Sequence, residues 1–254
     1  MILDAFRLDG AAALVTGASA GLGAAMAVAL AEAGADVAAH GNTRSPSDTC
    51  ERIESLGRRA AALTGDLADR ATSGLLVHDA VARLGRLDIL INNAGTIHRK
   101  PAAEVTDEDW DRVIEIDLTS AFRLARAAGR HMIAAARGGR IINIVSLLSF
   151  QGGIMVPAYT AAKAGLAQLT KALANEWAPS GINVNAIAPG YMETDNTRAL
   201  RADPVRSRQI LERIPAGRWG APADVAGAAV FLASPAAQYM HGHVLVVDGG
   251  WLGR

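Results

Sequence analysis

Short runs of β-branched and other aliphatic residues alternate with longer alanine-rich stretches along this 254-residue chain. Such alternation is typical of units in which each strand is followed by a helix and then by a parallel strand. It predicts an α/β fold with a doubly wound, seven-stranded parallel sheet flanked by helices. The expected strands are Ala11–Val15, Asp36–Ala39, Ala60–Thr64, Asp88–Ile91, Arg140–Val145, Asn183–Ile187 and Val244–Val247.

The connections between these strands are long enough to hold helices. A crossover takes about a dozen residues or more, and every interval but the last two is filled mainly by one helical stretch. The longest stretch is expected to carry a kink. No linker, internal repeat or low-complexity tract divides the chain, so residues 1–254 are expected to form a single domain. The expected helices are Gly21–Ala33, Ser47–Leu56, Arg70–Leu84, Asp107–Ala136, Ala158–Trp177 and Ala223–Leu232.

Charge and cysteine content argue against several classes of protein. The 25 basic and 25 acidic side chains balance, so there is no basic footprint for nucleic acid or anionic lipid. Cys50 is the only cysteine and the six histidines are scattered, so neither a disulfide nor a metal site is expected. No apolar stretch approaches the ~20 residues that span a bilayer, and the amino terminus is charged where a secretory signal is apolar. We therefore expect a cytoplasmic protein without nucleic-acid or membrane partners.

A glycine-rich segment, Thr16–Gly23, stands between the first expected strand and the first expected helix. Glycines let the chain turn sharply, let the backbone approach a pyrophosphate and let the helix pack closely on the strand. The amino end of the helix adds unpaired N–H groups and a positive dipole end. The segment therefore predicts a dinucleotide site on a Rossmann-type domain.

A phenol and an ammonium, those of Tyr159 and Lys163, lie four residues apart and share one face of an expected helix. Hydride transfer at a carbinol carbon needs a proton to move at its oxygen, and a free phenol with a pKa near ~10 is a poor base at neutral pH. A nearby ammonium lowers that pKa. Ser146, at the end of the fifth strand, is placed to hydrogen-bond the same substrate oxygen. The three residues predict a proton-transfer site.

The spacing Thr-Gly-x-x-x-Gly-x-Gly, with the Ser146, Tyr159 and Lys163 set, resembles the short-chain dehydrogenase/reductase family. Further motifs of that family follow in order: Asp66-Leu67, Asn92-Asn93-Ala94-Gly95 and Pro189-Gly190. The resemblance covers nearly the whole chain. It implies an NAD(P)-dependent oxidoreductase in which Tyr159 is the catalytic acid/base, Ser146 contacts the substrate oxygen and Lys163 also holds the nicotinamide ribose.

The same resemblance implies which residues bind the dinucleotide. In the family the Asp-Leu pair contacts the adenine, the Asn-Asn-Ala-Gly turn shapes the cleft, and a threonine after Pro-Gly holds the carboxamide. The implied cofactor-binding residues are Gly17, Ser19, Gly21, Leu22, Gly23, Asn42, Asp66, Leu67, Asn93, Ala94, Gly95, Tyr159, Lys163, Pro189, Gly190 and Thr194.

The end of the second strand bears on the choice between NAD and NADP. An acidic residue there bonds both ribose hydroxyls and repels a 2′-phosphate, but here Gly41 stands at about that position. Arg44 and Ser45 could contact a phosphate, whereas Asn42 could bond the hydroxyls. The subfamily resemblance described below favours NAD, with NADP left open.

Asp117 departs from the family pattern, which usually has an asparagine on the helix after the fourth strand. In the family that residue supports a water linked to the lysine, partly through its main-chain carbonyl. We expect Asp117 to keep this main-chain role and the protein to remain active. A carboxylate facing Lys163 would instead offset the effect of the ammonium on Tyr159.

Longer stretches resemble one subfamily, the 2-dehydro-3-deoxy-D-gluconate 5-dehydrogenases, also called 2-deoxy-D-gluconate 3-dehydrogenases. The resemblance implies transfer of hydride between NAD(H) and a secondary hydroxyl or ketone of a deoxy keto-sugar acid, in uronate breakdown. The matching stretches are Met1–Leu3, Ser149–Gly153, Ala174–Trp177, Asn185–Met192, Arg213–Gly220 and Val247–Leu252.

A sugar acid carries a carboxylate, so a cation is expected in its site. Arg99 follows the Asn92–Gly95 turn and can bind a carboxylate through two parallel hydrogen bonds; the alternative is a surface arginine paired with a local acid such as Glu104. Gln151 is a candidate hydroxyl contact, and it could equally brace the loop after Ser146. The predicted substrate residues are therefore Arg99, Gln151 and Ser146.

The polar segment 190–217 follows the sixth strand and has no evident place in the sheet. Long insertions of this kind often cover ligands, so we expect a substrate loop or lid. The alternative is an ordinary surface loop that covers no ligand.

Two other functions are compatible with the same fold. One is an NADPH-dependent 3-oxoacyl-thioester or general carbonyl reductase, and the other is a non-catalytic dinucleotide sensor. Members of the resembled family are usually homotetramers, which this neutral chain would not oppose by net charge.

Overall fold

The computed structural model describes residues 1–254 and is built on one parallel sheet of seven strands in the order β3-β2-β1-β4-β5-β6-β7. All seven predicted strands are confirmed, with ends that lie within two residues of the expected ones. The strands are β1 (Ala12–Val15), β2 (Asp36–Gly41), β3 (Ala60–Thr64), β4 (Ile89–Asn92), β5 (Gly139–Ile144), β6 (Ile182–Pro189) and β7 (Val244–Val247).

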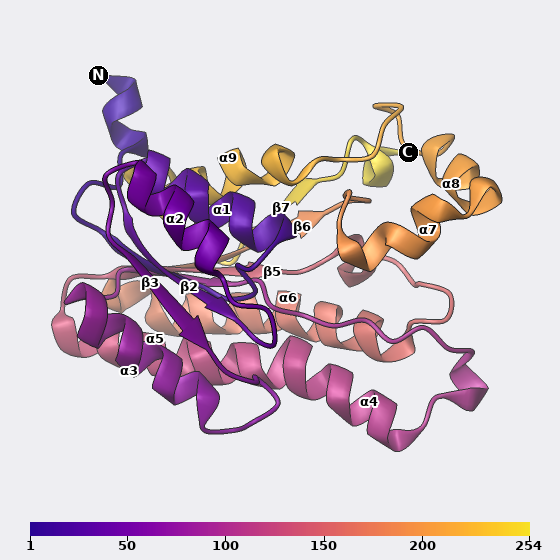
Figure 1. The fold of residues 1–254 in the computed structure, drawn as a ribbon, viewed down its shortest axis with the longest axis horizontal. Helices are drawn as coiled ribbons and strands as arrows, with labels where there is room; N and C mark the ends of the chain where they lie inside the picture. The colour runs from indigo at the N-terminus through magenta and orange to yellow at the C-terminus, as the bar shows by residue number, and fades with distance from the viewer.

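Helices cover both faces of the sheet, as the alternating pattern predicts (Figure 1). One layer consists of α1 (Gly21–Glu32), α2 (Ser47–Ser55) and α9 (Pro222–Ala233). The opposite layer consists of α3 (Thr72–Leu84), α4 (Asp107–Ile114), α5 (Ser120–Ala135) and α6 (Pro157–Trp177). The single α/β domain is thus a Rossmann-type fold. None of its helices combines the length and apolarity needed to cross a membrane.

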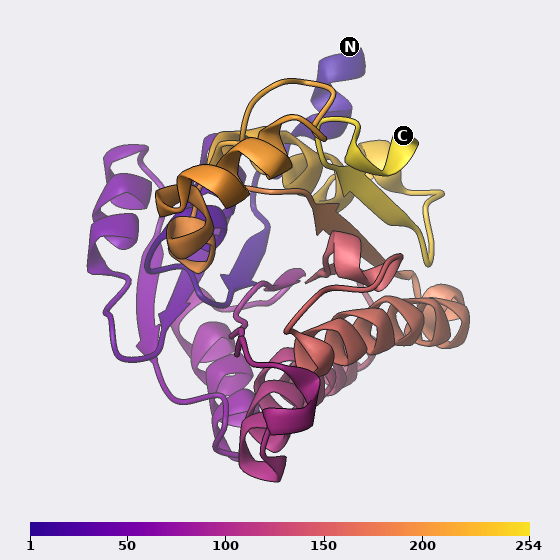
Figure 2. The same ribbon diagram turned by 90° about the vertical axis from the view of Figure 1, so that its right-hand side faces the viewer.

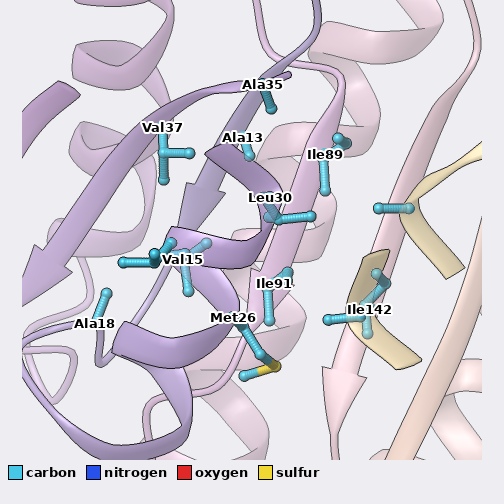
Figure 3. Packing of buried hydrophobic residues seen from close by; sticks show 14 of the residues in the cluster. Ala13, Val15, Ala18, Met26, Leu30, Ala35, Val37, Ile89, Ile91 and Ile142 are labelled. Carbon is cyan, nitrogen blue, oxygen red and sulfur yellow. The ribbon is translucent and has the colours of Figure 1, made fainter. Parts of the chain in front are cut away.

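The hydrophobic core consists of two layers of side chains, one on each face of the β-sheet. Two layers form because successive residues of a strand point to opposite faces. Val15 and Ile91 pack with Leu30 of α1 on one side (Figure 3). Leu14 and Leu90 pack on the other side with the α3, α5 and α6 layer. Strands buried on both faces explain why their sequences are continuously apolar.

The strand order reverses between β1 and β4, and this reversal positions the site. Chain connections leave in opposite directions on either side of such a point, so a crevice opens at the carboxyl ends of the strands. Val15 pairs with Ile91 in the register of these two strands. The glycine-rich segment after β1 and the Asn93–Gly95 turn after β4 therefore face each other at this edge.

The predicted helix 107–136 is broken by a π-helical turn, η3 (Glu115–Thr119), which separates α4 from α5. The predicted single helix is therefore two α-helices joined by this turn. Turns of this kind insert an extra residue into the helical repeat and occur often at functional sites. The turn carries Asp117 into the interior.

The segment 190–217, predicted as a loop, folds into short helices instead: η6 (Asp195–Thr197), α7 (Arg198–Ala202) and α8 (Pro204–Leu211). Figure 2 shows α7 and α8, in orange, at the end of the molecule where the carboxyl edge of the sheet lies. Ile210 and Ile214 anchor the segment in a small apolar cluster with Leu147, Trp219 and Trp251. The remaining short helical turns are η1 (Ile2–Phe6), η2 (Ala102–Glu104), η4 (Leu147–Ser149), η5 (Ala178–Ser180), η7 (Pro235–Ala237) and η8 (Trp251–Gly253).

Candidate active site

A cavity of about 680 Å³ opens at the carboxyl edge between β1 and β4. Its walls come from segments far apart in the chain, and they include most of the predicted cofactor-binding residues. The predicted residues that line it are Gly17, Ser19, Gly21, Leu22, Asn42, Asn93, Ala94, Gly95, Asp117, Ser146, Tyr159, Lys163, Pro189, Gly190 and Thr194.

The glycines of the first turn are required by close contacts. A Cβ on Gly23 would lie 2.2 Å from the carbonyl oxygen of Gly17 and 2.5 Å from Nδ2 of Asn93. Gly17 and Gly21 have left-handed φ angles of 64° and 57°, which other residues rarely adopt. The turn therefore exposes bare backbone at the amino end of α1, which suits a pyrophosphate.

Thr16 joins the two sides of the crevice. Its buried hydroxyl accepts hydrogen bonds of 3.0 Å from the backbone N–H groups of Asn93 and Ala94. The Asn93 side chain donates in return to the backbone oxygen of Thr16 at 2.9 Å. The turn after β4 is thereby held against the glycine-rich turn.

The end of β2 has no room for the acidic side chain that would exclude NADP. Ser19 donates a 2.6 Å hydrogen bond to the backbone oxygen of Arg44, and a Cβ on Gly41 would lie 2.1 Å from that oxygen and 2.2 Å from Ser19 Oγ. Asn42 and Arg44 line the cavity beside them. The residues that line the cavity at this corner are thus neutral or basic, and the Arg44 guanidinium pairs with exposed Asp48, which does not line the cavity, at 3.5 Å.

His40 is a buried residue at this corner that the sequence analysis did not assign to the site. Its Nδ1 accepts a long hydrogen bond, 3.5 Å, from the Gly17 N–H, so Nε2 carries the proton that bonds Gly65 O at 3.0 Å. Burial lowers the pKa of His40 below its ordinary value. A neutral imidazole thus supports the glycine turn, and no spacing in the sequence indicated it.

The implied adenine contacts are not among the residues that line the cavity. Asp66 is exposed and its Oδ1 accepts from the N–H of Ala68 at 2.9 Å. Leu67 is buried in the apolar layer against α3. Their role toward a cofactor therefore stays a prediction.

The first residues of α6 bring the phenol and the ammonium together, as their four-residue spacing predicts. Lys163 Nζ lies 5.5 Å from the centre of the Tyr159 ring and donates to the backbone oxygen of Ile144 at 3.0 Å. Ser149 fixes the helix by donating to the Lys163 backbone oxygen at 2.8 Å. Ser146 and Tyr159 line the same cavity, and the Ser146 hydroxyl acts to lower the pKa of Tyr159.

Opposing effects act on the Tyr159 phenol. Burial raises its pKa above the ordinary value, and the Asp117 carboxylate adds to that rise. The Lys163 ammonium, the Ser146 hydrogen bond and, more weakly, Arg99 act in the opposite direction. The net direction is upward, so the phenol of the protein without cofactor holds its proton at neutral pH.

The Asp117 side chain faces Lys163, and the expected role of its main-chain carbonyl stays a prediction. Its Oδ2 lies 3.2 Å from Lys163 Nζ, and its Oδ1 accepts from the Thr96 N–H at 2.7 Å. The physical reason is the π-helical turn, which directs this side chain toward α6 rather than toward solvent. This is the alternative orientation considered from the sequence, in which the carboxylate faces Lys163 and offsets the effect of its ammonium on Tyr159.

A second cavity, of about 530 Å³, adjoins the first, and Ser146, Tyr159, Pro189 and Gly190 line both. It is also lined by the other two predicted substrate residues, Arg99 and Gln151. Arg99 does not pair with Glu104; it donates to the backbone oxygen of Asn196 at 2.9 Å. The segment 190–217 thus forms one wall of this cavity.

Arg213, a cation not among the predicted substrate residues, also lines this cavity. The Arg213 guanidinium stacks 4.1 Å from the centre of the Trp251 ring, and Trp251 Nε1 donates to Gln151 Oε1 at 3.2 Å. Trp251 packs in the apolar cluster with Ile210 and Ile214 and also lines the cavity. These contacts join residues far apart in the chain, so no local spacing could indicate them.

Comparison with known proteins places the chain among oxidoreductases. A family model described as enoyl-(acyl carrier protein) reductase matches residues 17–252. The 2-dehydro-3-deoxy-D-gluconate 5-dehydrogenase of Escherichia coli (strain K12) is 53% identical over 254 residues, covering 100% of both chains. That of Bacillus subtilis (strain 168) is 52% identical, covering 99% of this chain and 98% of the relative.

Solved structures agree with this placement. A protein of Agrobacterium tumefaciens, provisionally named a 2-deoxy-D-gluconate 3-dehydrogenase, has NADP bound; it is 54% identical, with a TM-score of 0.92 and coverage of 98% of this chain and 99% of that one. A gluconate 5-dehydrogenase of Burkholderia cenocepacia, in complex with NADP and tartrate, is 38% identical, with a TM-score of 0.94 and coverage of 100% of both. The chain therefore belongs to the short-chain dehydrogenase/reductase family of NAD(P)-dependent oxidoreductases.

Proposed function

We propose that this protein transfers hydride between a nicotinamide cofactor and a secondary hydroxyl or ketone of a deoxy keto-sugar acid, of the 2-dehydro-3-deoxy-D-gluconate or 2-deoxy-D-gluconate type. The observation that carries the proposal is the meeting of the two cavities at Ser146 and Tyr159. A polar substrate in the smaller cavity then has its reacting oxygen beside the phenol, next to the larger cavity where a dinucleotide fits.

The residues of the larger cavity fit a dinucleotide. The bare backbone at Gly17 and Gly21 suits the pyrophosphate, Lys163 suits the ribose hydroxyls, and Thr194 lies beside the glycine turn, with Cγ2 3.7 Å from a Cβ built on Gly21. When bound, the cofactor supplies or accepts the hydride and, when oxidised, a positive charge on its ring.

The proposed chemistry of the protein is proton transfer at the substrate oxygen. Ser146 donates a hydrogen bond to that oxygen, and Tyr159 takes its proton in oxidation or gives one in reduction. The Lys163 ammonium stabilises the phenolate form during the exchange. Ser146, Tyr159 and Lys163 are thus the proposed catalytic residues.

The proposed substrate carries a carboxylate, and the smaller cavity presents cations for it. Arg99 and Arg213 both line this cavity, and an arginine can form two parallel hydrogen bonds with a carboxylate. The names of the most similar relatives support a sugar acid, and the relative crystallised with tartrate holds a small hydroxy acid. Gln151, held by Trp251, is the proposed hydroxyl contact.

We propose that the site accepts NADP as well as NAD, because none of the residues that line the cavity at this corner, Gly41, Asn42 and Arg44, is acidic and could repel a 2′-phosphate. The relatives solved with NADP support this. The preference for NAD suggested by the subfamily stays a prediction.

The proposal also covers the role of the segment 190–217, the cellular location and the assembly of the protein. The segment 190–217 is the proposed cover of the substrate cavity, since it lines that cavity and is anchored by Ile210 and Ile214. A cytoplasmic homotetramer, built through α5, α6 and β7, is the expected assembly. Its molar mass in solution, measured by light scattering, tests this assembly.

Steady-state assays of single sugar acids with NAD and NADP, each measured separately, test the proposed function. We expect turnover with a deoxy keto-sugar acid and a much larger Michaelis constant for a matching neutral sugar alcohol, because Arg99 and Arg213 would lose their partner. Turnover of 3-oxoacyl thioesters without turnover of any sugar acid would contradict the proposal and favour the thioester reductase.

A further inference from the structure

Asp117 is a carboxylate buried deep inside the site, with 1% of its surface exposed. Burying an ionised carboxylate costs several kcal/mol unless a counter-charge and hydrogen bonds compensate it. Oδ1 is compensated by the Thr96 N–H at 2.7 Å. Oδ2 has no hydrogen-bond partner of good geometry and faces Lys163 Nζ at 3.2 Å. Burial raises the pKa of Asp117 above its ordinary value, and the Lys163 ammonium is the main group that acts against this rise by favouring the ionised carboxylate.

The surroundings are shaped around this ion pair. A Cβ on Gly95 would lie 2.8 Å from Asp117 Oδ2 and 3.4 Å from Lys163 Nζ, so a glycine is needed where the pair meets. The backbone oxygen of Ile144 accepts from the ammonium at 3.0 Å on another side. Carboxylate and carbonyl together hold Lys163 Nζ in place beside the Tyr159 ring.

We propose that Asp117 is a positioning residue that holds the Lys163 ammonium beside Tyr159 and offsets its charge there, and so sets the pH range in which the phenol exchanges its proton. This inference rests on the proposed role of Tyr159 as the acid/base. An ion pair acts at a distance as a dipole, so Tyr159 experiences less positive potential than an unpaired ammonium would supply.

The groups that face Tyr159 come from four elements. Lys163 of α6, Ser146 after β5 and Arg99 after β4 favour the phenolate, and Asp117 of η3 is the one charged group that opposes it. Asp117 also raises the pKa of Lys163, against the lowering effect of burial. Loss of the carboxylate removes the one charge that opposes the phenolate, so the Tyr159 phenol is expected to become more acidic as long as Lys163 stays protonated.

The test is a phenolate absorbance titration of the protein without cofactor. The protein has three tyrosines, so the spectrum of a Tyr159→Phe version of each variant is subtracted to isolate one phenol. In Asp117→Asn we expect the Tyr159 transition to move down by about one pH unit or more, the size of effect typical of a nearby charge. Asp107→Asn, which removes an exposed carboxylate of α4, serves as the matched control.

A transition in Asp117→Asn that moves no further than in the Asp107→Asn control, or that moves upward, would overturn the inference. Circular dichroism over the same pH range shows that each variant stays folded, and Asp117→Ala provides a second removal of the charge. The high-pH limb of kcat/KM is expected to move in the same direction. Failure of the proposed substrate would remove turnover and leave the titration shift intact, so the two proposals fail separately.

Discussion

Replacing Thr16 with valine keeps the shape of a buried side chain and removes only its hydroxyl. That hydroxyl accepts hydrogen bonds of 3.0 Å from the N–H groups of Asn93 and Ala94 and donates weakly, at 3.3 Å, to Ile91 O. An unpaired, partly buried N–H costs about 1–3 kcal/mol. Both N–H groups are only partly buried, so we expect each to cost an amount near the lower end of that range. The expected total loss in the free energy of unfolding is about 2–3 kcal/mol.

Urea unfolding without cofactor, at one protein concentration, measures this loss, because a bound ligand or a change in assembly would shift the apparent stability. Thr160→Val is the matched control, since the Thr160 hydroxyl is buried without a partner and its removal is expected to be neutral or stabilising. Titration with NADPH should show at least about tenfold weaker binding in Thr16→Val, which corresponds to about 1.4 kcal/mol. Equal stability of Thr16→Val and Thr160→Val would refute the account of how the two turns are held together.

Three shorter predictions concern the corner at β2 and the substrate cavity. Gly41→Asp should bind NADPH more weakly than Gly41→Ala does, because both variants crowd Ser19 and only the first adds a repelling charge; equal affinities of the two variants would contradict this. His40 is neutral and its pKa is lowered by burial, so the unfolded chain gains a proton first as pH falls below ~6.5. The free energy of unfolding, measured with urea at several pH values, should therefore decline below that pH in the parent and decline less in His40→Gln. The same decline with pH in both proteins would contradict this role of His40. Arg213→Ala should raise KM for the sugar acid more than tenfold with a smaller change in kcat, since a charged hydrogen bond contributes about 1.5–3 kcal/mol, whereas exposed Arg130→Ala should leave KM unchanged.

Most of the fold was predictable from the sequence because its signals are local. The strands are short aliphatic runs, the glycine turn lies between a strand and a helix, and the order of elements allows one doubly wound sheet. The short helices α7 and α8 escaped prediction, since their segment is polar and its few apolar anchors, such as Ile210 and Ile214, follow no long helical period.

In the site too, the features that depend on local sequence were predictable and those that depend on distant residues were not. The spacing of Tyr159 and Lys163 on one helix predicted their proximity, and the structure confirms that proximity. The orientation of Asp117 depends on a π-helical turn and on the space at Gly95, neither of which leaves a local pattern in the sequence. Arg213 lines the substrate cavity and stacks on Trp251, which is distant in sequence, so no local pattern indicated it.

Replacing Tyr159 with phenylalanine removes the hydroxyl that the proposed chemistry uses and keeps the ring beside Lys163. Turnover of the sugar acid and the dissociation constant for NADPH are measured on the same preparation. We expect turnover to fall by about 10²–10⁴-fold, the range associated with loss of a general acid/base, while NADPH affinity changes little. Turnover within tenfold of the parent, with cofactor still bound, would contradict the assignment of Tyr159 as the proton-transfer group.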